Sequence, residues 1–178
     1  GHQVRDRIWL LPLMARAQLF ERLVLLDPFP GFRNHPPASL DGYEREDVEG
    51  RLSLMDQSYI GWANYLAPVV SGQATDGAIT GELSDSFCST EPAVTRVFAR
   101  TTFFADNRTD LPLVTVPCLI LQHQNDALVP LAVGQYVHTH LKGSTLKILD
   151  VAGHSAHMSH PSLVIAAMQE YFDQPSSR

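Results

Sequence analysis

The chain has 178 residues, 44% of them hydrophobic, and a formal net charge of −6. This length predicts one domain with enough apolar residues for a sizeable core. The excess of 19 acidic over 13 basic residues argues against a nucleic-acid or anionic-membrane partner, and no apolar run long enough to span a membrane occurs.

The cysteine content indicates a reducing compartment. Cys88 and Cys118 are the only two cysteines, too few for a disulfide framework. Free cysteine is among the most frequently buried residue types. We therefore expect both to be reduced core residues of a cytoplasmic protein.

The N-terminal quarter combines a weak helix, a short strand and a loop. A helix over residues 5–18 would contain Pro12, which removes a backbone hydrogen bond from a helix interior. Leu23–Leu26 is an all-apolar run that predicts a strand buried on both faces. Residues 28–41 contain four prolines and read as a loop.

Residues 43–108 carry a helical pattern. Val48, Leu52 and Met55 recur at helical spacing. Thr90 followed by Pro92 predicts a new helix start, with Thr90 as the cap and the proline in the first turn. This region is expected to be a group of helices inserted between two strands.

Strands and helices alternate after Pro112. The apolar patterns predict strands over 117–121 and 145–151, and helices over 131–141 and 162–172. Such alternation predicts an α/β fold, in which a parallel sheet has helices outside it.

An acidic and a basic residue follow these two strands. Asp126 comes after the first, and His154, preceded by Gly153, comes 28 residues later after the second. A His that accepts a proton and an Asp that orients it are two members of a catalytic triad. The alternatives are a loop Asp that caps the helix near Pro130 and a surface His.

Residues 19–172 resemble the RsbQ family of bacterial stress-response proteins, which is related to the plant strigolactone and karrikin receptors. The resemblance covers the C-terminal part of an α/β-hydrolase domain. Six stretches in the expected order carry it: 19–26, 59–63, 87–92, 103–106, 114–117 and 153–161.

The resemblance implies a domain organisation and a chemistry. Residues 1–42 and 109–178 would form a partial hydrolase core, and residues 43–108 a helical cap. Asp126 and His154 would be the acid and base of a serine hydrolase of small apolar or ester-like molecules. The RsbQ branch works with a partner phosphatase, which implies a signalling partner.

The nucleophile position departs from the family pattern. Within Gly1-His2-Gln3-Val4-Arg5, Gln3 stands where the Gly-x-Ser-x-Gly elbow has its serine, and Arg5 stands at the second glycine. An amide supplies neither alkoxide nor thiolate, so no acyl-enzyme can form there. We expect this chain to be non-catalytic.

Three histidines near the C-terminal end have a regular spacing that could suggest a metal site. His154, His157 and His160 are spaced by three, but no Cys or carboxylate joins them locally, so neither a metal nor a cofactor is expected. His123, His138 and His140 are assigned no role.

Six aromatic residues of the helical region could line a pocket for an apolar ligand or form that region's own core: Trp62, Tyr65, Phe87, Phe98, Phe103 and Phe104.

Three functions remain open: a hydrolase with its nucleophile elsewhere, a ligand-binding or signalling module, and a truncated hydrolase remnant. The family sheet has about eight strands, and only its last three are recognisable here. An unpaired strand edge and uncovered apolar surface recruit other chains, so we expect self-association.

Overall fold

The computed structural model describes residues 19–31 and 43–174. Gln3, the expected helix over residues 5–18, most of the expected loop after Pro28 and the last four residues lie outside the described residues.

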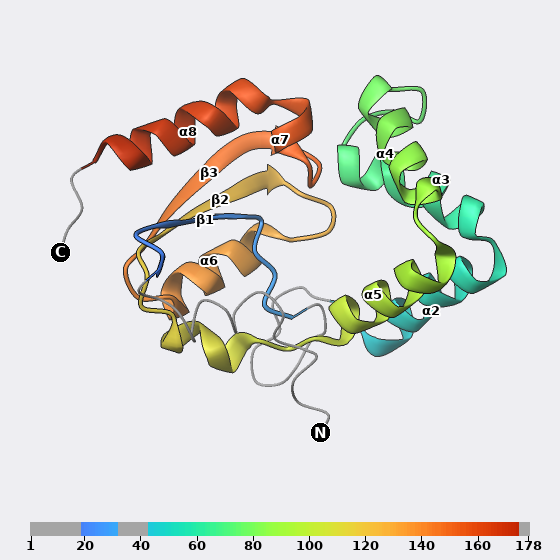
Figure 1. The fold of residues 1–178 in the computed structure, drawn as a ribbon, viewed down its shortest axis with the longest axis horizontal. Helices are drawn as coiled ribbons and strands as arrows, with labels where there is room; N and C mark the ends of the chain where they lie inside the picture. The colour runs from blue at the N-terminus through green and yellow to red at the C-terminus, as the bar shows by residue number, and fades with distance from the viewer. Residues whose placement is uncertain (1–18, 32–42, 175–178) are drawn as a thin grey trace.

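A three-stranded parallel sheet forms the centre of one half of the molecule (Figure 1). Its strands, in spatial order, are β1 (Leu23–Leu26), β2 (Cys118–Asn125) and β3 (Ser144–Ala152). The parallel arrangement confirms the α/β prediction. Because the strands are parallel, their carboxyl ends meet at one edge of the sheet.

Helices cover both faces of this sheet (Figure 1). Cys118 and Ile120 pack on one face with residues of α6 (Leu131–His140), whereas Leu119 and Leu121 pack on the other with residues of α8 (Pro161–Asp173). This alternation follows from the two-residue period of a strand. Among the described residues, this half also contains two short helices, η2 (Arg108–Leu113) before β2 and α7 (Ala156–Ser159) after β3.

The burial of the strands differs from the expectation at β1. β2 is buried from Cys118 to His123, but Leu23–Leu25 are only half-buried and Leu26 is 39% exposed. The prediction that β1 is buried on both faces is therefore wrong for the described residues. β1 forms the edge of the described sheet and pairs there with β2.

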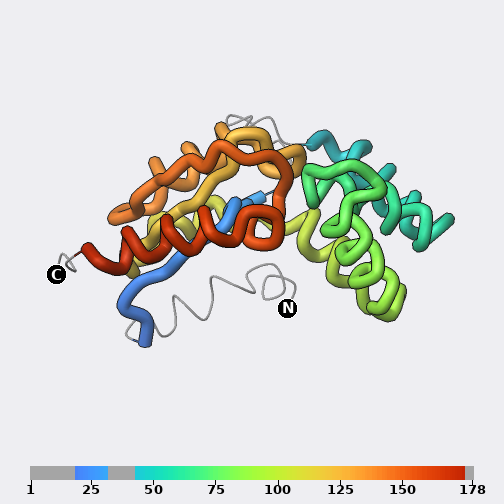
Figure 2. The backbone as a smooth tube through the Cα atoms, turned by 90° about the horizontal axis from the view of Figure 1, so that it is seen from above, coloured from blue at the N-terminus to red at the C-terminus, as the bar shows by residue number. Residues whose placement is uncertain are grey.

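Four helices form a second layer beside the sheet, called here the helical lobe (Figures 1 and 2). They are α2 (Arg45–Gln57), α3 (Tyr59–Ser71), α4 (Ala78–Ser89) and α5 (Pro92–Phe104). The lobe has its own core, which includes the predicted helical face of α2; its buried members are Val48, Leu52, Met55, Trp62, Ala63 and Ala99.

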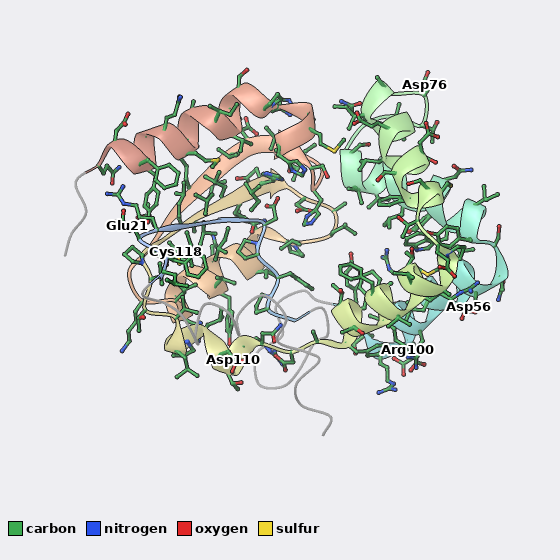
Figure 3. The ribbon with its side chains drawn as sticks, viewed as in Figure 1. Glu21, Asp56, Asp76, Arg100, Asp110 and Cys118 are labelled. Atoms are coloured by element: carbon green, nitrogen blue, oxygen red, sulfur yellow. The ribbon has the colours of Figure 1, made fainter. Side chains whose placement is uncertain are left out.

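Two local predictions need correction. The N-cap residue of α5 is Glu91 rather than Thr90, and its side chain makes no capping hydrogen bond. Cys88, near the end of α4, is exposed rather than buried, because it falls on the solvent side of that helix. Cys118 is buried as expected and lies inside the sheet half, whereas Asp76 and Arg100 lie at the rim of the lobe (Figure 3).

Within the described residues, no helix combines the length and the hydropathy needed to cross a bilayer.

Candidate active site

Four ionisable side chains gather at the carboxyl edge of the sheet. Asp27 follows β1, His123 lies near the end of β2, Asp126 follows β2, and His154 follows β3. This edge is where open α/β sheets place their ligands and catalytic groups. The structure thus brings together the two residues that the sequence singled out and adds two that it did not.

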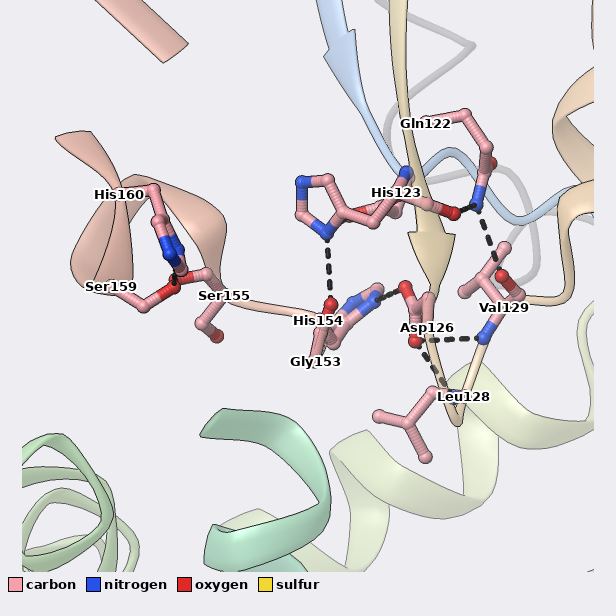
Figure 4. A network of polar contacts seen from close by, with 11 residues as sticks. Gln122, His123, Asp126, Leu128, Val129, Gly153, His154, Ser155, Ser159 and His160 are labelled. Carbon is pink, nitrogen blue, oxygen red and sulfur yellow. Dashed lines mark hydrogen bonds and ion pairs between the residues drawn. The ribbon is translucent and has the colours of Figure 1, made fainter. Parts of the chain in front are cut away.

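Asp126 and His154 form a hydrogen-bonded pair (Figure 4). His154 Nδ1 lies 2.7 Å from Asp126 Oδ2. The other carboxylate oxygen, Oδ1, accepts the backbone N–H groups of Leu128 (2.7 Å) and Val129 (3.1 Å). Asp126 therefore performs both functions considered for it: it fixes the turn before α6 and holds the imidazole. With Nδ1 committed to Asp126, Nε2 is the atom of His154 that can exchange a proton.

The loop that carries His154 depends on Gly153. Gly153 has φ +82°, in the left-handed region, and a Cβ at this position would lie 2.5 Å from the carbonyl oxygen of Ser71. Only glycine fits both constraints. The N–H of His154 then donates to the carbonyl oxygen of Val70 at 2.7 Å, which joins this loop to the end of α3.

The environment of His154 favours its protonated form. Burial lowers its pKa, but the hydrogen bond and the negative charge of Asp126 outweigh burial, so the pKa lies above the ordinary value. The conjugate acid of a general base is stabilised by a neighbouring carboxylate. Asp126 supplies that carboxylate to His154.

Asp27 and His123 form a second, fully buried pair, which the sequence did not reveal. His123 Nδ1 lies 2.6 Å from Asp27 Oδ2, and each side chain is only 1% exposed. The backbone N–H of His123 also donates to Asp27 Oδ1 at 2.8 Å. Asp27 follows β1 and His123 lies near the end of β2, and no signal in the sequence links them, because only the pairing of these strands brings them together.

Asp27, His123 and Asp126 lie close enough together to suggest a metal site. Both oxygens of Asp126, however, already accept hydrogen bonds from His154 and the turn before α6. An ion on Asp126 would have to displace His154. The donor set therefore fits a hydrogen-bonded cluster better than a metal centre.

The series His154, His157 and His160 does not converge on a metal either. His160 Nδ1 contacts the hydroxyl of Ser159 at 2.9 Å, and His157 is exposed on α7. His138 and His140 make local contacts at the end of α6.

A cavity of about 420 Å³ opens at the surface of the helical lobe, where its lining residues Val94 and Phe98 are 57% and 65% exposed. Four of the six aromatic residues considered above line it, namely Trp62, Phe87, Phe98 and Phe103, whereas Tyr65 and Phe104 do not. The other lining residues are Leu66, Thr90, Val94, Thr95, Ala99 and Thr102. This size and apolar character suit a small, mostly apolar molecule.

Residues 85–177 match the family model described as TAP-like protein, an α/β-hydrolase (abhydrolase) family. A probable esterase of Oryza sativa subsp. japonica is 34% identical over 94% of this chain and 62% of its own length. A strigolactone esterase of Pisum sativum is 34% identical over 91% of this chain and 61% of its own length.

The solved structure of a hydrolase from Oleispira antarctica has a TM-score of 0.88 and 36% identity, over 98% of this chain and 64% of that one. An esterase from Exiguobacterium antarcticum shares the fold at 16% identity, with a TM-score of 0.82, over 95% of this chain and 63% of that one. The chain thus spans less than two thirds of the length of these relatives.

Proposed function

Because the chain belongs to the α/β-hydrolase family, we propose that it binds a small apolar or ester-like molecule in the cavity of its helical lobe. In this proposal the lobe, residues 43–108, is a cap over a partial hydrolase core formed by residues 1–42 and 109–178. Binding proceeds without a covalent intermediate, because Gln3 occupies the position of the nucleophile.

The observation that carries the proposal is the apolar lining of the cavity. Trp62, Phe87 and Phe103 supply aromatic walls, and Thr102 supplies a hydroxyl group that could donate a hydrogen bond to an ester oxygen. A few polar groups in an otherwise apolar cavity are typical of small-molecule sites.

The named relatives include a karrikin insensitive 2 receptor of Petunia hybrida, 32% identical over 94% of this chain and 61% of its own length. This similarity supports, as part of the proposal, a role in which ligand binding is reported to a protein partner. The resemblance to RsbQ proteins supports a cytoplasmic stress-signalling setting for that role.

A second candidate function is hydrolysis with a nucleophile other than residue 3. The geometry of Asp126 and His154 favours it, since the 2.7 Å contact leaves Nε2 of His154 ready to accept a proton. The two candidates differ in one respect: the hydrolase forms a covalent adduct and the binding module does not.

Ligand binding can be measured through Trp62, which lines the cavity. In a Trp9→Phe background, Trp62 is the sole tryptophan, because the chain has two. Titration with phenyl butyrate and with the corresponding amide, which resists hydrolysis, should give saturable changes in fluorescence for both compounds.

Two neighbouring threonines provide a matched control. Thr102 lines the cavity and Thr101 does not. Thr102→Phe should fill the cavity and abolish the saturable change, whereas Thr101→Phe should leave it intact. Equal binding by both variants would contradict the proposed site.

A further inference from the structure

The buried pair of Asp27 and His123 has no part in the proposed ligand site. Both residues are buried, and neither Asp27 Oδ2 nor His123 Nε2 has a hydrogen-bond partner among the described residues. Burial of ionisable groups is unfavourable unless their interactions compensate for lost hydration.

Two acceptors determine which nitrogen of His123 carries a proton. Nδ1 lies 2.6 Å from Asp27 Oδ2 and 2.9 Å from the carbonyl oxygen of Gly153. A carbonyl oxygen can only accept, so an unprotonated Nδ1 would face a lone pair at that distance. The geometry therefore requires a proton on Nδ1, which is donated to the Gly153 carbonyl oxygen and lies within ion-pair distance of the Asp27 carboxylate.

The backbone of Asp27 is also unusual. Its φ of +41° is in the left-handed region, and among the described residues it is the only non-glycine with a positive φ. Such conformations persist where surrounding contacts fix them, and they concentrate at functional sites. Here the N–H of Asp27 donates to the carbonyl oxygen of Leu121 at 2.9 Å, and its carboxylate contacts His123 twice.

The contact with Gly153 connects this pair to His154. Gly153 immediately precedes His154, and its own N–H donates to the carbonyl oxygen of Asn125 at 3.1 Å. His123 is the side chain that holds the Gly153 carbonyl oxygen (Figure 4). Rotation of that peptide would turn the backbone from which the imidazole of His154 projects.

We propose that Asp27 and His123 are a positioning pair: Asp27 fixes the tautomer of His123, and His123 fixes the Gly153 carbonyl and thereby the orientation of His154 against Asp126. The pair thus resembles the Asp126–His154 pair in its chemistry, but acts on the backbone. The inference concerns the position of His154 and holds whether or not a ligand binds in the lobe.

The charged groups that surround His123 belong to the Asp27–His123 and Asp126–His154 pairs. Asp27 on β1, Asp126 after β2 and His154 after β3 all influence the titration of His123. Burial raises the pKa of Asp27. Burial lowers the pKa of His123, but the hydrogen bond and charge of Asp27 reverse this, so its pKa is raised. Both shifts help the cluster to retain its protons.

The unmodified chain provides the first test. Long-range ¹H–¹⁵N NMR correlations identify which ring nitrogen of a histidine is protonated. His123 should carry its proton on Nδ1. If Nε2 alone carries the proton, Gly153 has no donor and the proposal is overturned.

Two substitutions at His123 separate positioning from packing. In His123→Asn, the side-chain amide can donate to Gly153 from nearly the place of Nδ1, whereas His123→Leu fills the space without a donor. We expect the Nδ1 proton of His154 to exchange with water about tenfold faster in the Leu variant, the factor that matches one lost hydrogen bond, and nearly as slowly as in the parent in the Asn variant. The reverse order would show that His123 only fills space.

Asp27→Asn removes the carboxylate that fixes the tautomer, and Asp150→Asn makes the same change at an exposed site on β3. The first should lower the fraction of His123 that carries its proton on Nδ1 and should broaden the signals of Gly153 and His154; the second should leave them unchanged. Unaltered signals in Asp27→Asn would contradict the proposal. Because these readouts need no ligand, failure of the fluorescence titration would not affect them.

Discussion

The carbonyl oxygen of Val70 accepts the backbone N–H groups of both His154 (2.7 Å) and Ser155 (3.1 Å). Val70 lies in the last turn of α3, so the helical lobe holds the loop that carries the candidate base. These two hydrogen bonds therefore connect the helical lobe to the edge of the sheet. A change in the lobe that shifts the end of α3 would be transmitted to His154.

Replacing either of two facing glycines should break this connection. Gly72 and Gly153 both have positive φ, and a Cβ on Gly72 would lie 2.6 Å from the backbone nitrogen of Gly153. Since backbone cannot move aside cheaply, we expect Gly72→Ala or Gly153→Ala to lower the free energy of unfolding by about 2–4 kcal/mol. Urea denaturation followed by circular dichroism measures this change.

Gly50 is the matched control. It lies within α2, and a Cβ there would meet no atom within 4 Å. Gly50→Ala should raise the free energy of unfolding by about 0.5–1 kcal/mol, because alanine favours the helix. A free energy of unfolding for Gly72→Ala as high as that for Gly50→Ala would contradict the close backbone contact.

Stability should decrease as the pH rises through neutrality. The pKa values of His123 and His154 are raised in the folded state, mainly because carboxylates outweigh their burial. A group with a raised folded pKa contributes stability that is complete below the unfolded value, about 6.5, and is lost as the pH rises through the folded value. Urea denaturation at pH 6, 7 and 8 should therefore give falling free energies of unfolding.

Asp126→Asn tests the source of this pH dependence. Without the carboxylate, the pKa of His154 is no longer raised by its partner, so the decline between pH 6 and pH 8 should become shallower. A stability that rises over this range in the parent chain would contradict the assignment of both pairs.

The two cysteines should react at very different rates. Cys88 is exposed, whereas Cys118 is buried and burial raises its pKa to about 11. The thiolate is the reactive form, so a thiol reagent such as Ellman's should modify one thiol per folded chain and two after denaturation. Cys88→Ser should abolish the native reaction. Rapid modification of both thiols in the folded chain would contradict the described packing around Cys118.

The sequence predicted the elements that carry their own local signal. The apolar runs before Asp126 and His154 place both residues at strand ends, and parallel strands bring such ends together. The side chains of β2 also alternate regularly, since neighbouring residues pack on opposite faces of the sheet. For these reasons the proximity of Asp126 and His154 could be predicted without coordinates, whereas their expected roles as acid and base came from the resemblance to the RsbQ family.

The Asp27–His123 pair could not be identified in this way. Its members are 96 positions apart in the sequence, and only the pairing of β1 with β2 brings them together. The sequence pattern around a histidine near the end of an apolar strand is the same whether its side chain is exposed to water or buried in a core. The exposure of Cys88 was missed for a similar reason, because it depends on which side of α4 the lobe covers.

Self-association remains a prediction. Apolar side chains are exposed on α8 and beside its end, including Leu19 (64%), Ile165 (52%) and Phe172 (47%). Exposed apolar surface of this kind recruits other chains. Light scattering at micromolar concentration should show species larger than a monomer. Ile165→Glu should reduce them, whereas Ile60→Glu, at a more exposed position on α3 (66%), should not.

The central claim is recognition of an apolar or ester-like molecule without covalent chemistry at residue 3. Intact-mass spectrometry after incubation with a serine-directed phosphonate ester tests it most directly. The account predicts an unmodified mass under conditions in which an active serine hydrolase is fully labelled. One phosphonate per chain, lost on His154→Ala, would contradict the account and establish the Asp126–His154 pair as part of a working hydrolase.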